Sequence, residues 1–125
     1  MIISMGTDLC DKSRIAQVLE RRGSAFAQRI LTPSEYDRYI HRADRCDFLA
    51  RRFAAKEAAA KALGLGIGRG ISWQQIEIKN NDLGAPELTL SDAALLRFEA
   101  LGATRSHITI SDEKSHALAF VIFES

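Results

Sequence analysis

The sequence has few of the features that mark secreted, membrane or metal-cluster proteins. It contains only two cysteines, Cys10 and Cys46, which are too few for a disulfide scaffold and match no common metal-ligand spacing. No apolar run approaches the roughly 20 residues of a membrane-spanning helix. The first ten residues, MIISMGTDLC, have neither the basic start nor the apolar stretch of a secretory signal. We therefore expect no membrane partner and a cytoplasmic location with reduced thiols.

The chain also lacks a large net charge, because 17 Lys and Arg residues are balanced by 16 Asp and Glu residues. The charges are nevertheless unevenly distributed. Residues 12–52 contain ten basic and five acidic side chains, whereas residues 71–125 contain four and eight. The amino-terminal half therefore predicts a basic surface for an anionic partner. We expect no nucleic acid, because the basic residues lack interleaved aromatic side chains for base stacking.

Proline is scarce too, with two residues, and no linker or repeat divides the chain. A length of 125 residues suits one domain with its own core, so we expect a single domain over 1–125. The first half predicts a strand at 2–5, ended by Gly6-Thr7-Asp8, and then three helices. They are one capped by Asp11 and ending near Gly23, one from Ser24 to Leu31, and one opened by the capping box Thr32-Pro33-Ser34-Glu35.

The second half has strand patterns around one helix. We expect strands at 73–79, at Leu88 and Leu90, at 107–111 and at 117–123, and a helix that Ser91 caps and Gly102 ends. Helices followed by mainly antiparallel strands predict an α+β fold.

The strongest helical segment is residues 48–64, FLARRFAAKEAAAKALG. It contains no proline and no β-branched residue, and Gly64 stands in the usual C′ position. Its alanines, together with Phe48, Leu49 and Phe53, cover most of the circumference. We therefore expect a central helix that is buried on most sides.

This helix nevertheless carries Arg52, Lys56, Glu57 and Lys61. One interpretation is a partly exposed face with a Glu57–Lys61 pair one turn apart. The other is a ligand site, because small alanines leave room for close approach and an anion across Arg52 and Lys56 would relieve their repulsion. The segment GLGIGRG at 64–70 adds a flexible loop whose amide groups are suited to hold a phosphate.

Asp8 follows the first predicted strand and precedes a helix, where a carboxylate is often only a cap or turn residue. A functional interpretation is also open. Mg²⁺ takes one or two protein carboxylates and completes its octahedron with water and substrate phosphates. Asp8 and Glu57 would supply such a pair if the fold brings them together, which the sequence alone does not show.

Two segments carry a more specific signal, GTDLCDKSRI at 6–15 and FAAKEAAAKALG at 53–64. They resemble the two signature motifs of the bacterial holo-acyl-carrier-protein synthase family, the small class of phosphopantetheinyl transferases. The resemblance continues in RILTPSEYDRY, GLGIGRGISWQQIEI, NDLGAPEL and HITISDEKSHALAFVI, and so covers nearly the whole chain in order. It implies a phosphopantetheinyl transferase-like fold, with an antiparallel sheet packed on the long central helix.

The resemblance implies an enzyme that transfers 4′-phosphopantetheine from coenzyme A to a serine of apo acyl carrier protein, in support of fatty acid biosynthesis. It implies that Asp8 and Glu57 bind Mg²⁺, that Glu57 or a metal-bound water receives the serine proton, and that Lys61 neutralises phosphate charge. All three would be catalytic. The implied coenzyme A contacts are Arg52, Lys61, Gly64, Gly66, Gly68, Pro86 and His107.

One position departs from the family's pattern. Many relatives have a histidine where Asp112 stands, at a position associated with the nucleotide end of coenzyme A. His107 matches the family separately, although a lone strand histidine is equally compatible with packing. The contacts to the 3′-phosphate and the adenine are therefore left open, as are the carrier that is modified and the tolerance for acyl-coenzyme A.

Acyl carrier proteins are acidic, so we expect the helix bearing Arg14, Arg21 and Arg22 to be the docking surface for the carrier. Two other classes of function stay open. A non-catalytic adaptor would use these arginines but not Asp8 or Glu57. A metal-dependent hydrolase of phosphate esters would have the metal site but would need no carrier.

The last strand predicts an assembly. Residues 117–123, ALAFVIF, are apolar at every position, so both faces of this strand should be buried. In so small a domain, one face would then need cover from another subunit unless an internal helix covers both. That face bears either Leu118, Phe120 and Ile122 or Ala119, Val121 and Phe123. The resemblance implies a homotrimer with sites shared between subunits, whereas the sequence pattern alone does not choose the number.

Overall fold

The computed structural model describes residues 1–125 and confirms the α+β fold. Strands β1 (Ile2–Asp11), β5 (His116–Glu124) and β4 (Arg105–Asp112) form an antiparallel sheet in the order β1-β5-β4, and β2 (Ile76–Asn80) pairs with β3 (Pro86–Leu90). The helices are α1 (Lys12–Arg22), α2 (Ser24–Ile30), α3 (Pro33–Tyr39), α4 (Arg45–Ala62) and α5 (Asp92–Ala100), with a 3₁₀ turn η1 (Trp73–Gln75) before β2. None of these helices combines the length and the hydrophobicity that crossing a membrane requires.

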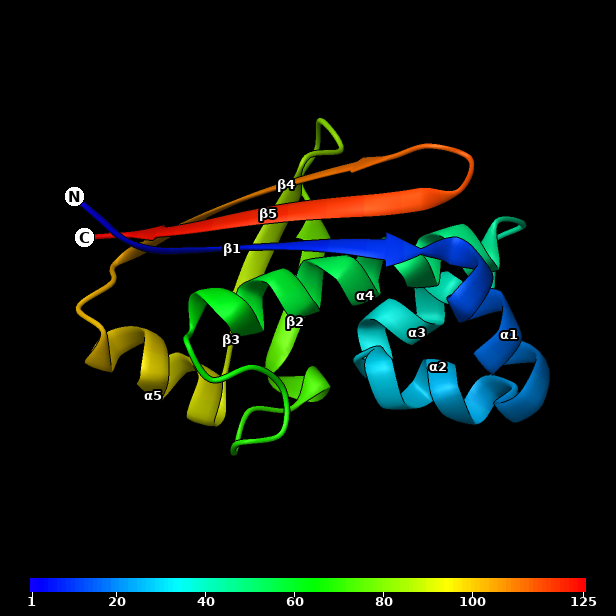
Figure 1. Cartoon of the computed structure of the whole chain (residues 1–125), viewed down its shortest axis with the longest axis horizontal. Coiled ribbons are helices and arrows are strands. Elements are labelled where there is room, and N and C mark those ends of the chain that lie inside the picture. Colours follow the sequence, from blue (N-terminus) through cyan, green and yellow to red (C-terminus); the bar gives the residue numbers. More distant parts are fainter.

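The three-stranded sheet lies along one side of α4, and the other helices flank the two ends of α4 (Figure 1). Helices α1, α2 and α3 gather at its amino-terminal end, and α5 lies near its carboxyl end. The β2–β3 hairpin crosses behind α4. The chain termini are neighbours, since the Ser125 amide donates to the Met1 carbonyl oxygen at 2.9 Å. The long helix is therefore the element on which both sheets and all the other helices are arranged.

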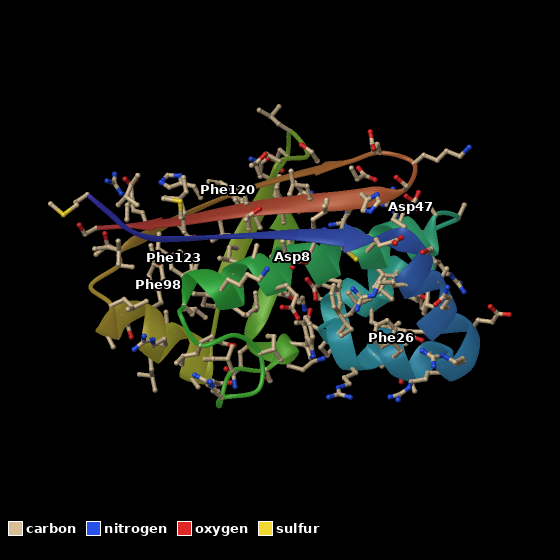
Figure 2. The ribbon with its side chains drawn as sticks, in the orientation of Figure 1. Asp8, Phe26, Asp47, Phe98, Phe120 and Phe123 are labelled. Carbon is tan, nitrogen blue, oxygen red and sulfur yellow. The ribbon has the colours of Figure 1, made fainter.

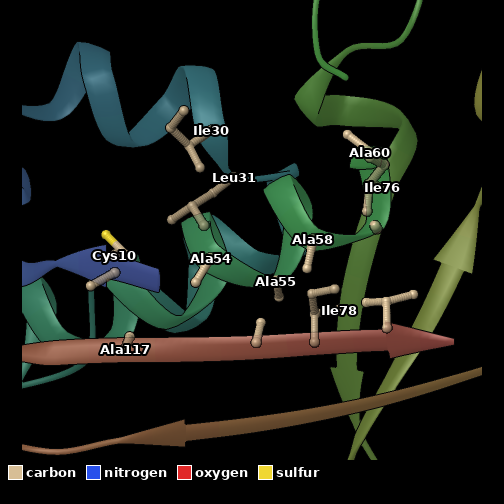
Figure 3. Close-up of a cluster of buried hydrophobic side chains, with 14 of the residues drawn as sticks. Cys10, Ile30, Leu31, Ala54, Ala55, Ala58, Ala60, Ile76, Ile78 and Ala117 are labelled. Atoms are coloured by element: carbon tan, nitrogen blue, oxygen red, sulfur yellow. The ribbon is translucent and has the colours of Figure 1, made fainter. Parts of the chain in front are cut away.

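Helix α4 is buried because its core positions are alanines. They are Ala50, Ala54, Ala55, Ala58, Ala59, Ala60 and Ala62, none of which is more than 1% exposed. Side chains from α2, β2 and β5 close around them, as Figure 3 shows for Ile30, Ile78 and Ala117. Small side chains let the strands approach the helix axis closely while the interior stays densely packed. The helix starts after Asp44, and Gly64 follows its end with a φ of 83°, as expected for a C′ glycine.

Strand β1 is longer than the sequence predicts. It pairs with β5 as far as Asp11, opposite His116, so Gly6-Thr7-Asp8 does not end the strand. The prediction that Asp8 lies beyond the strand is therefore wrong. Gly6 is needed for close packing rather than for a turn, because a Cβ at this position would lie 2.1 Å from the Ala58 carbonyl oxygen on α4.

The helix starts predicted at Asp11 and Thr32 agree with the structure more closely than the predicted strand bounds do. The Asp11 side chain accepts a hydrogen bond from the Ser13 amide at the start of α1, and the capping box of Thr32 and Glu35 is complete. The predicted strand at 73–79, in contrast, begins as the 3₁₀ turn η1 and becomes a strand only at Ile76.

The two faces of β5 have different surroundings. The inward face bears Ala117, Ala119, Val121 and Phe123, all fully buried, and the outward face bears Leu118, Phe120 and Ile122. Phe123 packs edge to face on Phe98 of α5, with ring centroids 4.9 Å apart, and Phe120 lies on the other side of the strand (Figure 2). The helices lie on the side of the sheet that faces α4 (Figure 1), and Leu118 on the outward face is 43% exposed, so the alternative of internal helix cover on both faces is excluded within one subunit.

Candidate active site

The candidate site lies where β1 passes over the carboxyl-terminal half of α4. Asp8 lies between the two elements (Figure 2), and Lys61 Nζ is 3.1 Å from Asp8 Oδ1. Lys61 also donates to the Thr7 carbonyl oxygen at 2.9 Å. Burial raises the pKa of Glu57, the nearby Asp8 charge raises it further, and the Lys61 charge opposes the shift. The structure thus brings Asp8 of β1 to the Glu57–Lys61 pair of α4, a meeting that the sequence alone did not show.

Gly6 allows this approach, whereas the sequence indicated it only as part of the end of the first strand. A Cβ on Gly6 would lie 2.1 Å from the Ala58 carbonyl oxygen and 2.7 Å from the Ala62 amide nitrogen. Both are backbone atoms, so strand and helix would have to separate. Ser4 Oγ reinforces the contact by donating to the Ala62 carbonyl oxygen at 2.6 Å. The signal in the sequence was the glycine two residues before Asp8 in the first motif.

The donor set at this site fits Mg²⁺. Asp8 and Glu57 offer carboxylate oxygens, which are the ligands that Mg²⁺ prefers. No group of three or more His, Cys, Asp or Glu side chains is placed to hold a metal ion, so the remaining positions would go to water and substrate phosphates. Two carboxylates beside the single ammonium of Lys61 suit a divalent cation.

A groove leads from Asp8 along α1. Its first part, of about 210 Å³, is lined by Asp8, Arg14, Val18, Phe26 and Phe53 among others. A second part, of about 240 Å³, shares Val18, Phe26 and Phe53 and adds Arg21, Arg22, Arg29 and Trp73. We call this continuous surface the α1 groove. All three arginines predicted to dock the carrier line it, Arg14 in the part that contains Asp8 and Arg21 and Arg22 in the part farther along α1. The groove thus has an apolar floor and a basic rim.

Pro86 and His107 lie together in a different cavity. It has a volume of about 420 Å³ and is lined by Asn81, Pro86, Glu87, Leu88, Ser106, His107 and Ile108. The His107 ring is exposed and its Nε2 lies 2.7 Å from Glu124 Oε1, so this histidine is not a core residue. Neither Pro86 nor His107 lines the α1 groove. Within one chain, the predicted coenzyme A contacts therefore fall into two separate places.

Arg52 and Lys56 form ion pairs with a carboxylate of the protein itself, that of Glu35. Glu35 Oε1 is 2.6 Å from Lys56 Nζ, and Glu35 Oε2 is 3.5 Å from Arg52 Nε. All three side chains are less than 5% exposed. Burial lowers the pKa of Arg52 to about 10 and also lowers the pKa of Lys56, while the Glu35 charge opposes both shifts. The carboxylate of Glu35, from α3, therefore already lies across the two cations and relieves their repulsion, although its single negative charge leaves one positive charge unbalanced.

Arg52 still belongs to the surroundings of the second cavity. Its Nη2 donates to Asn80 Oδ1 at 3.0 Å, and Asn80 is the register partner of Pro86. Its Nε is buried with no hydrogen-bond partner. A contact between Arg52 and coenzyme A stays a prediction, and the structure associates it with Pro86 rather than with Asp8.

The glycine loop is built differently from the expectation. Its amide groups on Gly64, Gly66 and Gly68 donate to the carbonyl oxygens of Lys61, Ala60 and Ile71. Because these three N–H groups already have partners, the prediction that they hold a phosphate is not supported. A contact of this loop with coenzyme A stays a prediction for its other groups, including the exposed Arg69.

Asp112 has a structural role. Its Oδ2 accepts from Lys12 Nζ at 2.9 Å and from Arg51 Nη1 at 3.2 Å. The hydrogen bond from Lys12 makes the largest contribution to lowering the pKa of Asp112. The carboxylate that departs from the family's histidine thus ties the end of β4 to α1 and α4.

The whole chain is similar to known phosphopantetheinyl transferases. Residues 4–121 match the sequence model of the 4′-phosphopantetheinyl transferase superfamily. The chain is 50% identical over 131 aligned residues to the holo-(acyl-carrier-protein) synthase of Shewanella piezotolerans, and the match covers 100% of both chains.

Solved structures show the same likeness. The crystal structure of holo-(acyl-carrier-protein) synthase from Neisseria meningitidis matches with a TM-score of 0.92 and 41% identity, over 100% of each chain. The Bacillus anthracis enzyme in complex with coenzyme A (3′,5′-ADP) matches with a TM-score of 0.83 and 36% identity, over 100% of this chain and 98% of that one.

Proposed function

Because the chain belongs to the 4′-phosphopantetheinyl transferase superfamily, we propose that it transfers 4′-phosphopantetheine from coenzyme A to a serine of apo acyl carrier protein. The other product is adenosine 3′,5′-bisphosphate, and the holo carrier serves fatty acid biosynthesis. The observation that carries the proposal is the meeting of Asp8 from β1 with Glu57 and Lys61 from α4, at a point where Asp8 also lines the α1 groove. Full-length similarity to holo-(acyl-carrier-protein) synthases supports it.

The reaction is a phosphoryl transfer, in which a protein mainly positions groups and stabilises charge. Asp8 and Glu57 would hold Mg²⁺, which when bound supplies a Lewis acid at the pyrophosphate of coenzyme A. Lys61 stabilises the negative charge that develops on the phosphate and the leaving group. The acceptor of the serine proton is Glu57 or a water beside it.

The carrier docks in the α1 groove. Arg14, Arg21 and Arg22 give this groove a basic rim, and Val18, Phe26 and Phe53 give it an apolar floor. A basic rim steers an acidic carrier toward the site, and the apolar floor contributes contact area. The serine would then arrive beside Asp8, at the end of the same groove.

We also propose that the active protein is a homotrimer with sites at subunit interfaces. The outward face of the three-stranded sheet is apolar: Met5 is 57%, Leu9 64% and Leu118 43% exposed in the single chain. A patch of this kind usually marks an interface. The cavity with Pro86 and His107 would complete the Asp8 site of the neighbouring subunit, which accounts for the separation of the two places within one chain.

Both cysteines, Cys10 and Cys46, are free thiols. Free thiols persist in the reducing cytosol, whereas oxidising compartments favour disulfides. We therefore propose that the enzyme works in the cytoplasm.

One experiment tests the function directly. The purified protein is mixed with Mg²⁺, coenzyme A and an apo acyl carrier protein, and the carrier is weighed by mass spectrometry. We expect the carrier to gain one phosphopantetheine. No mass change with several carriers would favour a non-catalytic adaptor, and breakdown of coenzyme A without transfer would favour a hydrolase.

A further inference from the structure

Resting on the proposed function, we infer that Lys61 is an internal counter-ion that competes with the metal for Asp8. In this arrangement Lys61 neutralises Asp8 until a phosphate of coenzyme A draws the ammonium away. The divalent cation then binds tightly only together with coenzyme A. Lys61 therefore couples the two ligands, in addition to any role in the transition state.

The contacts of Lys61 support this inference. Its ammonium is held by two oxygen acceptors of β1, the Asp8 carboxylate at 3.1 Å and the Thr7 carbonyl at 2.9 Å. Lys61 is the only ion-pair partner of Asp8, although Arg14 lines the same groove. Glu57 has no ion-pair partner within 4.0 Å. One of the two candidate metal ligands is thus already neutralised by the protein and the other is not.

A metal ion and this ammonium cannot both lie against Asp8 without strong repulsion. The Lys61 charge lies 3.1 Å from a carboxylate oxygen that would ligate the metal. Like charges at such short range, in a partly buried site, repel far more strongly than in water. A divalent cation that binds without coenzyme A must therefore either displace Lys61 from Asp8 or bind against its repulsion. Either requirement weakens the affinity for the cation.

Lys61 is free to move, whereas Asp8 is not. The Lys61 side chain is 51% exposed and ends a flexible four-carbon stem. The Asp8 side chain is 16% exposed and extends from a strand that is paired along its length with β5. A phosphate arriving at the site offers the ammonium a new anionic partner. Once Lys61 moves to that phosphate, Asp8 is released for the metal, so each ligand strengthens the binding of the other.

The test measures metal binding without the reaction. Mn²⁺ serves as the probe for the Mg²⁺ site, and free Mn²⁺ is followed by electron paramagnetic resonance in the absence of coenzyme A. Lys61→Met removes the charge and keeps a side chain of similar length. We expect the variant to bind Mn²⁺ about 5- to 150-fold more tightly than the wild type, the range typical of coupling between two ligands.

A matched control removes the same charge elsewhere. Lys79 lies on β2 and pairs with Glu77 at 3.7 Å, so Lys79→Met should leave the Mn²⁺ affinity unchanged. With saturating coenzyme A, the difference between wild type and Lys61→Met should narrow, because Lys61 has then left Asp8 in the wild type. Lys61 is half exposed, so Lys61→Met should fold. If the circular dichroism of Lys61→Met differs from that of the wild type, Lys61→Gln serves as a second neutral variant.

Three outcomes would overturn the inference. One is Mn²⁺ binding by both neutral variants that is equal to or weaker than that of the wild type. Another is Mn²⁺ binding that survives Asp8→Asn, since the metal would then lie elsewhere. In both cases, phosphopantetheine transfer by the wild type would leave the proposed function intact. A wild type that neither transfers phosphopantetheine nor binds Mn²⁺ in the presence of coenzyme A would overturn both this inference and the proposed function.

Discussion

Asp8 and Glu57 come from different elements, β1 and α4, and each supplies only part of the proposed metal site. We expect Asp8→Ala and Glu57→Ala each to lower kcat by about 10²-fold or more, with the fold retained. The double variant should be hardly worse than either single variant, because residues that act as a unit are not additive. Steady-state transfer assays on the three variants measure this. If the fold-loss of kcat in the double variant equals the product of the two single fold-losses, the two carboxylates do not share one ion.

Gly6 positions Asp8 without any side chain of its own. We expect Gly6→Ala to lower the free energy of unfolding by about 1–3 kcal/mol, the usual cost of overpacking, because the new Cβ meets the Ala58 carbonyl oxygen. Turnover should fall as well, because Asp8 moves away from Glu57 and Lys61. Urea denaturation and the transfer assay measure the two effects.

Gly102→Ala is the matched control for this prediction. Gly102 has a φ of +84°, and no atom lies within 4 Å of a Cβ built on it, so the substitution adds backbone strain but no clash. It should destabilise the protein by about 1–2 kcal/mol and leave turnover unchanged. Normal turnover in Gly6→Ala would show that the close contact of β1 with α4 does not position Asp8.

At the level of elements, the β4–β5 hairpin is attached to the helices through charge. The hydrogen bond from Lys12, and then the charge of Arg51, lower the pKa of Asp112. A carboxyl whose folded pKa is lowered stabilises the fold above its unfolded pKa, and this stability is lost as the pH falls through the folded pKa. Thermal unfolding should therefore show a melting temperature that decreases as the pH falls below about 4.

Asp112→Asn should lower the melting temperature at pH 7 and reduce this acid dependence. Part of the dependence should remain, because the Arg42 hydrogen bond likewise lowers the pKa of Asp44. Glu113→Gln changes a neighbouring carboxylate that makes no ion pair and should keep the wild-type profile. An unchanged profile in Asp112→Asn would show that the hairpin is held by its backbone pairing alone.

Helix α1 is the element on which we propose that carrier recognition depends. Charge reversal by Arg14→Glu or Arg21→Glu should raise the KM for the carrier on the order of tenfold and flatten its salt dependence, because electrostatic steering is lost. The KM for coenzyme A should hardly change. Initial rates at several salt concentrations measure both values. An equal increase in the KM for the carrier and in the KM for coenzyme A would place these arginines in the nucleotide site instead.

At the scale of the whole molecule, the proposed assembly depends on the outward face of β5. Phe120→Asp puts a charge on the outward apolar face of β5, so we expect the proposed trimer to dissociate and activity to be lost together. Light scattering at micromolar concentration gives the mass, and the transfer assay gives the activity. Leu96→Asp, at a 68% exposed position on α5, should change neither. An active wild-type monomer would refute the shared sites.

The sequence by itself determined the helices and the family. The cap at Asp11, the capping box of Thr32 and Glu35, and the C′ glycine Gly64 were all correct. Such signals are reliable because they depend on hydrogen bonds and propensities among residues a few positions apart. The short motifs around Asp8 and Glu57 likewise identified a family that full-length similarity then showed.

Only the tertiary structure decided which charges meet and which face is left open. The sequence did not predict that β1 continues past Asp8, because its last residues pair with β5, more than 100 positions away. It did not reveal that Glu35 pairs with both Arg52 and Lys56, because that carboxylate comes from another helix. It also left open which side of β5 faces α4. These features depend on contacts between distant residues, and no local propensity encodes such contacts.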